Sequence, residues 1–293
     1  MTALRLLVGA RAHRAEQLST ALLIGLAVGV VVVPALSRTN ALSIGDALAT
    51  RLLPPGARDP GGSLHILGTD RFGRDLLVRM MLAGRVSLAV GVVGSVVAAL
   101  VGTAVGGAAA WVGGVLDRLL MAAADVLLAI PRLVLLLVCA TLWRPGFGTV
   151  VVVLVATGWM GISRIIRAEL LGVRTRPFVE AATALGAPAW RVLWRHAIPN
   201  SLGPVIVATT LGVGNAILLE SGLSFLGLGI QPPEPSWGNM IAGGRDLIVT
   251  APWVALAPGL ALIVTVLACT LLGDAMRDRL AGDTGAATLR DRA

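Results

Sequence analysis

The chain has 293 residues, of which 56% are hydrophobic, and its mean hydropathy is +0.85. This composition excludes a soluble globular domain and indicates a protein that crosses a membrane several times. The formal net charge is +8, and all the basic residues are arginines. These flank apolar runs without forming one basic stripe, which argues against nucleic acid as a partner.

Apolar runs predict an all-α, polytopic membrane protein with six transmembrane helices. A helix needs about 20 residues to cross a bilayer core. Five charge-free runs approach or exceed this length, and a sixth contains only two charges; the six cover residues 18–36, 86–116, 119–143, 146–163, 197–219 and 247–273. Residues 35–37 faintly resemble a signal-peptide cleavage site, but the first run is longer than a usual signal core. We therefore predict that the first span is retained.

The spans divide the chain into five predicted parts. These are a cytoplasmic tail (1–17), the first transmembrane helix (18–36), an extracytoplasmic segment (37–85), a five-helix core (86–273) and a second cytoplasmic tail (274–293). The core includes a cytoplasmic loop at 168–200 and an outer loop at 222–251. With both termini in the cytoplasm, 14 of the 24 arginines lie inside, nine lie outside and Arg132 lies in a span, as the positive-inside rule favours.

The first outer segment combines turn signals with charges. Gly68 and Gly73 suit tight turns, and Asp70 or Asp75 could cap the helix that follows. Two interpretations of Asp70, Arg74 and Asp75 stay open. They form a lid that is folded on its own ion pairs, or they contact substrate, a docking protein or an outer gate.

Ionisable residues inside spans are costly and usually face a partner or a pathway. An unbroken third helix would place Asp125 and Arg132 on one face, about 10 Å apart along the axis. Contact between them would require a bend, which Pro131 could permit. We expect each of them to pair with another helix or a partner subunit, or to line a pathway. Asn215 could line the pathway or bond across helices, and Glu220 could cap an outer gate or make a helix-end hydrogen bond.

Residues 178–200, between the fourth and fifth spans, have the pattern of a short helix–turn–helix. Pro177 can begin a helix because a first-turn residue needs no N–H, and Glu180 then lies where a carboxylate favours the helix dipole. Gly186 can end this helix in a left-handed turn, and Pro188 can begin the next. A thin, alanine-rich helix suits a groove in another protein, although an ordinary cytoplasmic loop could have the same spacing.

The same loop resembles the EAA loop of ABC-importer permeases. Five residues carry this resemblance: Glu180, Ala181, Ala182, Gly186 and Pro199. It implies that they form a coupling helix in a cleft of an ATPase subunit. His196 stands where the general pattern has isoleucine, and Ile198 where it has leucine. The Arg-His-x-x-Pro-Asn form of residues 195–200 is similar to the peptide and nickel branch.

Two motifs in the predicted outer segments narrow the resemblance to one branch of these permeases. Leu-Gly-Thr-Asp-x-x-Gly-Arg-Asp at 67–75 looks like the N-terminal signature of the C-type permease of dipeptide, oligopeptide and nickel importers. The segment 220–238, which ends in Pro-Ser-Trp-Gly, is similar to that family's second outer loop. With three motifs in order, the chain is identified as a member of this family. The resemblance implies a type I, MetI-like permease fold in the bacterial inner membrane.

The resemblance also implies partners. These are a B-type permease subunit, two ATPase domains, an extracytoplasmic solute-binding protein and membrane lipid. A Walker A phosphate loop requires a lysine, and the chain has none. We therefore expect ATP and Mg²⁺ to be held by the ATPase subunits. No cluster of residues has the spacing of a metal site, and we expect no enzyme activity, cofactor or metal site in this chain. The expected function is import of short peptides by alternating access.

Other interpretations stay open. A nickel or metal-chelate importer would use a closely similar permease. An ion-coupled secondary transporter would need carboxylates near the midplane and internal repeats; Asp125 is one such carboxylate, but no repeat is apparent. Trp237, in the second outer loop, is expected either to anchor the binding protein or to lie at the membrane interface.

Overall fold

The computed structural model describes residues 2–37 and 47–290, with side chains for 16–37 and 49–280. Residues 38–46 of the predicted outer segment lie outside the described residues. Most of the described chain is helical, and the strands described in it form one antiparallel hairpin, β1 (Ala57–Arg58) and β2 (Leu64–His65). This confirms the predicted all-α class.

Five helices are long and apolar enough to cross a membrane: α1 (Thr2–Leu36), α3 (Leu76–Val112), α6 (Phe147–Val173), α9 (Ile198–Phe225) and α11 (Trp253–Arg290). A sixth crossing results if α4 (Gly114–Ala129) and α5 (Arg132–Thr141) count as one bent span. Because α1 begins at Thr2 and α11 ends at Arg290, most of both predicted tails continues the helix of the adjacent span.

The predicted third span, 119–143, is not one straight helix, because α4 and α5 meet at a bend of 92°. Pro131 lacks an N–H, and its ring disfavours the helical conformation of the preceding residue. Ile130 accordingly has φ −83° and ψ 128°. The prediction that Asp125 and Arg132 would share a helix face is therefore wrong, since they lie on two helices on either side of the bend.

Helices α3 and α6 pack so closely that their backbones touch. A Cβ atom at Gly102 would lie 2.6 Å from the Trp159 carbonyl oxygen, and one at Gly106 would lie 2.1 Å from that of Ser163. Ile166, beside this contact, is fully buried. Small residues let membrane helices approach in this way, where dispersion contacts replace the hydrophobic effect as the attraction.

One arginine joins α1 to α3. Pro34 has no N–H, so the carbonyl of Val30, four residues earlier, loses its helical donor. Arg85 donates from Nε to this carbonyl and from Nη2 to that of Val31 at 3.0 Å. An unsatisfied carbonyl in hydrocarbon costs on the order of several kcal/mol, so Arg85 removes a penalty in α1 and fixes α1 against α3.

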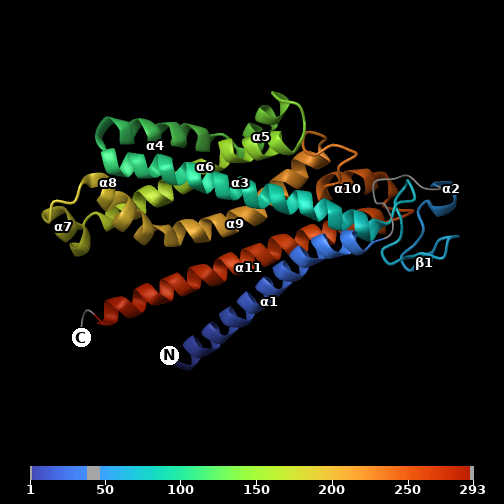
Figure 1. Cartoon of the computed structure of the whole chain (residues 1–293), viewed down its shortest axis with the longest axis horizontal. Coiled ribbons are helices and arrows are strands. Elements are labelled where there is room, and N and C mark those ends of the chain that lie inside the picture. Colours follow the sequence, from blue (N-terminus) through green and yellow to red (C-terminus); the bar gives the residue numbers. More distant parts are fainter. Residues whose placement is uncertain (1, 38–46, 291–293) are drawn as a thin grey trace.

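The loops gather at two ends of the helix bundle (Figure 1). One end carries the ends of α1 and α11 nearest the termini, together with α7 (Pro177–Ala184) and α8 (Ala189–Val192). The opposite end carries α2 (Ala47–Thr50), the β1–β2 hairpin and α10 (Trp237–Gly244). The loop at 178–200 and the two predicted outer segments therefore lie at opposite ends, as six crossings require.

Candidate functional site

The loop between α6 and α9 folds as its sequence predicts. Pro177 is the first residue of α7, and Pro188 directly precedes α8. The N–H of Gly186 donates to Thr183 O (3.0 Å), and that of Ala187 donates to Ala182 O (3.1 Å). These two bonds form a Schellman motif, and Gly186 has the left-handed φ of +81° that the motif requires.

The residues that match the EAA pattern lie on or beside α7. Glu180 is in the first helical turn and is exposed, as is Ala181. Ala182 is half-buried and packs against the core below α7. Pro199 lies in the first turn of α9 and is exposed. The loop therefore presents one polar and alanine-rich surface to the outside of the molecule.

Three large apolar side chains that the sequence-based prediction did not single out are exposed at this end. Leu185, Trp190 and Trp194 are 89%, 62% and 64% exposed. The two tryptophans are four residues apart, so they lie about one helical turn from each other. Two tryptophans at this spacing in an arginine-rich loop are a sequence signal from which an exposed apolar surface could have been predicted. Clustered apolar side chains at a surface mark a contact with a protein or membrane.

A hollow of about 650 Å³ lies beneath α7 and α8. Its wall includes Trp111 at the end of α3 and Arg174 at the end of α6. The Arg174 guanidinium lies 5.3 Å from the Trp111 ring centroid and donates to Ala110 O at 2.7 Å. Arg174 thus joins the point where the loop leaves α6 to the neighbouring helix α3, and a push on the loop would act on both helices.

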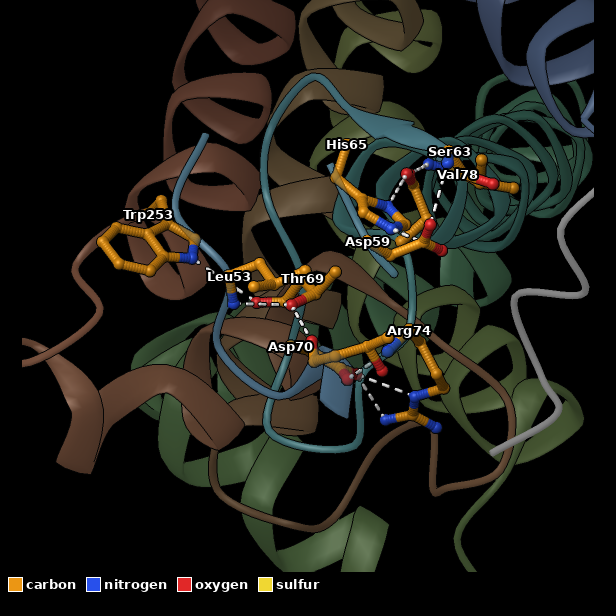
Figure 2. Close-up of polar contacts among 11 residues, drawn as sticks. Leu53, Asp59, Ser63, His65, Thr69, Asp70, Arg74, Val78 and Trp253 are labelled. Carbon is orange, nitrogen blue, oxygen red and sulfur yellow. Dashed lines mark hydrogen bonds and ion pairs between the residues drawn. The ribbon is translucent and has the colours of Figure 1, made fainter. Parts of the chain in front are cut away.

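At the opposite end, Asp70 organises a tight turn (Figure 2). Its carboxylate accepts from the N–H groups of Phe72 (2.8 Å) and Arg74 (3.0 Å) and from Arg74 Nε (2.7 Å). Asp70 is 5% exposed. This geometry favours the interpretation of a lid folded on its own ion pairs, because Asp70 has little surface left for another molecule.

Asp75 caps α3 and joins it to the hairpin. One carboxylate oxygen accepts from the Val78 N–H at 3.0 Å, and the other lies 2.7 Å from His65 Nδ1. His65 Nε2 is in turn 3.5 Å from Asp59 (Figure 2). Of the two predicted candidates, Asp70 and Asp75, the structure confirms Asp75 as the cap of α3. His65 and Asp75 are buried, so neither offers a surface for docking.

The two outer segments meet around a second hollow, of about 390 Å³. The first segment contributes three arginines, one aspartate and one phenylalanine to its lining, and the second contributes proline and amide groups: Asp70, Arg71, Phe72, Arg74, Arg79, Pro232, Pro233 and Asn239. The guanidinium groups of Arg71 and Arg74 lie 4.8 and 4.6 Å from the Phe72 ring centroid. A concave surface with a basic rim suits an acidic group of a partner protein.

Glu220 is fully buried where α3, α9 and α10 meet. It accepts hydrogen bonds from the hydroxyls of Ser87 (2.9 Å) and Ser224 (2.7 Å). The Ser87 oxygen also accepts from the Trp237 N–H at 3.3 Å. This arrangement supports the interpretation of Glu220 as a helix-end hydrogen-bonding group, and it leaves no part of the carboxylate at the surface.

Trp237 is also buried, with 1% of its surface exposed. Its ring packs against α3, where the absence of a side chain at Gly84 leaves room for it, and its Nε1 donates to Met80 O at 3.1 Å. The predictions that Trp237 would be an exposed anchor for a partner or a residue at the membrane interface are both wrong. The ring instead holds α10 against α3.

Replacing Trp237 by phenylalanine should lower stability without weakening any contact at the outer surface. The change removes the bond to Met80 and leaves a small void, so we expect a loss of about 1–3 kcal/mol. Thermal melting in detergent would measure it. The same change at exposed Trp194 is the control and should leave the melting temperature within error. Equal melting of wild type and Trp237→Phe would contradict the packing role.

A third cavity, of about 530 Å³, lies within the membrane-spanning helices and brings Arg132 and Asn215 together. Its walls come from α3, α5, α6, α9 and α11. Asp125 is not part of its lining and lies 3.4 Å from Arg164, with both side chains 58% exposed. The structure therefore unites two of the three predicted pathway residues and separates the third.

Known proteins resemble this chain over most of its length. Residues 87–284, more than half of the chain, match the family described as binding-protein-dependent transport system inner membrane component. A Brucella abortus protein, provisionally named a peptide transport system permease, is 37% identical over 268 residues, which are 92% of this chain and 88% of that protein. The oligopeptide transport system permease protein OppC of Haemophilus influenzae is 38% identical over 216 residues, 74% of this chain and 70% of OppC.

A solved structure shares the fold. A chain of the MetNI methionine ABC transporter, in inward-facing conformations, superposes with a TM-score of 0.56 at 21% sequence identity. The match covers 69% of this chain and 95% of that chain. The predicted MetI-like fold is thereby confirmed.

Proposed function

Because this chain belongs to the family of binding-protein-dependent transport system inner membrane components, we propose that it is the permease subunit of an ATP-driven importer of short peptides. The names of its Brucella and Haemophilus relatives support peptides as the substrate class. The observation that carries the mechanism is the position of the α7–α8 loop, which is exposed at the end opposite the outer segments (Figure 1).

The loop has the features of a docking element for an ATPase subunit. Glu180 and Ala181 lie exposed on a short helix, and Leu185, Trp190 and Trp194 add apolar surface that another protein would bury. ATP and Mg²⁺ would be held by two ATPase domains, since this chain lacks the lysine of a Walker A loop. Closure of those domains would move the loop and, through the Arg174 contact, the inner ends of α3 and α6.

A second permease subunit of B type would complete the pathway. The cavity that contains Arg132 and Asn215 would then lie near the interface between two subunits, and rigid-body rocking of their helices would open it to each side in turn. Exposed apolar side chains along α1, α4 and α11 would face lipid or this partner. The chain itself needs no cofactor for this role.

The outer hollow would receive the extracytoplasmic binding protein. Arg71, which is exposed at its rim, favours an acidic group on that protein, whereas Arg74 is already paired with Asp70. This assignment moves the proposed docking surface away from Trp237, Glu220 and Asp75, which are buried. The proposed orientation puts both termini and the loop on the cytoplasmic side of a bacterial inner membrane.

Two alternatives receive less support. For a metal-chelate importer, the described residues contain no group of three His, Cys, Asp or Glu side chains that could hold a metal ion. For an ion-coupled transporter, the candidate carboxylate Asp125 is exposed and paired with Arg164 outside the cavity. The first observation gives no support to a metal-binding site in the pathway, and the second gives none to a proton-coupling or cation-coupling site.

Uptake by living cells tests the proposed function. Deletion of this chain should abolish uptake of radiolabelled di- to pentapeptides, and a plasmid copy should restore it, whereas nickel uptake should stay unchanged. The deletion strain must lack all other peptide transporters, because these could take up the peptides in place of this one. Unchanged peptide uptake in that strain, or a specific loss of nickel uptake, would overturn the proposed substrate class.

A further inference from the structure

The membrane cavity has a lining suited to a flexible polar chain. Four glycines, Gly94, Gly158, Gly161 and Gly212, leave room along its walls. Hydroxyl and amide groups come from Ser95, Thr209, Asn215 and Thr270. Among the described residues that line it, Arg132 is the only one with a charge. A single cation in such a cavity indicates a preference for one anionic group.

No acid on a neighbouring helix neutralises Arg132 in the part of the chain that the structure describes. Its Nε is buried and has no hydrogen-bond partner among the described residues. Asp125 is paired with Arg164, and the Glu220 carboxylate is occupied by the hydroxyls of Ser87 and Ser224. A cation without a counter-charge inside a membrane is costly and marks a ligand or ion pathway.

The position of Arg132 favours a carboxylate as that ligand. The guanidinium lies against α6, where a Cβ at Gly158 would be 3.4 Å from its Nη2, so the missing side chain gives it space at the cavity wall. Arg132 is also the first residue of α5, where the helix dipole adds positive potential. A guanidinium binds carboxylates through two parallel hydrogen bonds, which fixes the orientation of the bound group.

We propose that Arg132 binds the C-terminal carboxylate of a peptide in transit through this cavity. Every linear peptide carries this group, so one cation serves substrates of any sequence. Asn215, whose side chain is exposed in the cavity, can donate to and accept from the adjacent peptide amide. The inference rests on the proposed function, because it concerns peptides as substrates.

The test compares a peptide that has a free C-terminus with the same peptide amidated at its C-terminus. The binding protein must bind both forms, and uptake into proteoliposomes is normalised to that affinity. Arg132→Gln removes the charge and keeps a polar side chain of similar length. We expect it to lower kcat/KM for the free peptide about tenfold or more, as loss of a charge-assisted hydrogen bond does, and to leave the amidated peptide within about twofold.

Three controls separate this role from a structural one. Arg132→Lys should restore part of the preference for the free peptide. Arg164→Gln removes a charge on α6 outside the cavity and should leave the ratio unchanged. Arg132→Gln could instead lower the melting temperature or lose the partner permease, with an equal fall in the uptake of both peptides. This outcome would show that a carboxylate of the partner pairs with Arg132 and would overturn the proposal. An unchanged free-peptide rate would overturn it as well.

A plug at Gly161 distinguishes failure of this inference from failure of the proposed function. A Cβ at Gly161 meets no atom within 4 Å, so Gly161→Phe can fill the cavity without a backbone clash. It should block free and amidated peptides equally while the complex stays assembled. Normal uptake by Gly161→Phe would remove this cavity from the pathway and overturn the role of Arg132, yet leave the peptide-importer function to be judged by the deletion strain.

Discussion

Gly106→Ala should prevent α3 and α6 from packing and should strongly reduce the amount of folded chain in the membrane. The new methyl group would lie 2.1 Å from the Ser163 carbonyl oxygen and 2.5 Å from Ile166. The first neighbour is backbone in a helix, which cannot move aside as a side chain can. The two helices would have to separate, at a cost of about 3 kcal/mol or more. Detergent-extracted protein, analysed by size-exclusion chromatography and thermal melting, would measure the loss.

Gly107→Ala is the matched control, one residue further along the same helix. Its methyl group would lie 3.8 Å from Leu170, which is an ordinary contact, and alanine favours a helix over glycine by about 1 kcal/mol. We expect its yield and melting temperature to equal or slightly exceed those of the wild type. If the two alanine variants behaved alike, the close approach of α3 and α6 would be refuted.

Features set by a few neighbouring residues were predictable. The end of α7 depends on Gly186 and the preceding turn, and the cap of α3 depends on Asp75 three residues before Val78. Pro131 showed where a bend was permitted, because the residue before a proline avoids the helical conformation, although residues 119–143 were predicted to form one span. The size of that bend was not predictable, since it depends on how both halves pack against α6.

The environment of the outer residues could not be read from their own segment. Trp237 stands among prolines and glycines, which suggests an exposed loop, yet its partners are Ser87 and Met80 on α3, 150 and 157 residues away. Glu220 likewise finds its donors on a distant helix. Such burial follows from the packing of whole helices, and no local pattern encodes it.

For the pathway residues too, local features were predictable from the sequence, whereas their arrangement in space was not. Arg132 and Asn215 each stood out as polar groups in apolar runs, and that much the sequence predicted. Their meeting in one cavity depends on the bend at Pro131, which separates Arg132 from Asp125. A straight helix would have placed both residues on one face, about 10 Å apart and too far for an ion pair, whereas the bent one leaves Asp125 at the surface with Arg164.

Gly186→Val is expected to lower both binding-protein-stimulated ATP hydrolysis and transport while the chain stays folded. Gly186 has φ +81°, and a left-handed conformation costs an ordinary L-residue roughly 1–2 kcal/mol, with β-branched residues worse. Relief of this strain would break the bonds to Thr183 and Ala182 and would displace Leu185 and Trp190 from the surface they form. We expect binding-protein-stimulated ATPase activity and uptake in proteoliposomes to fall about tenfold or more.

The space around Gly186 makes this a test of backbone conformation, because a Cβ there meets no atom within 4 Å. Gly186→Asn should keep most of the coupling, since asparagine tolerates the left-handed region. Gly172→Val adds the same side chain on α6, again with no atom within 4 Å, and should transport normally. Equal losses of transport in the valine and asparagine variants of Gly186 would point to a clash with the ATPase subunit. Normal coupling in Gly186→Val would show that the Schellman turn does not set the docking geometry.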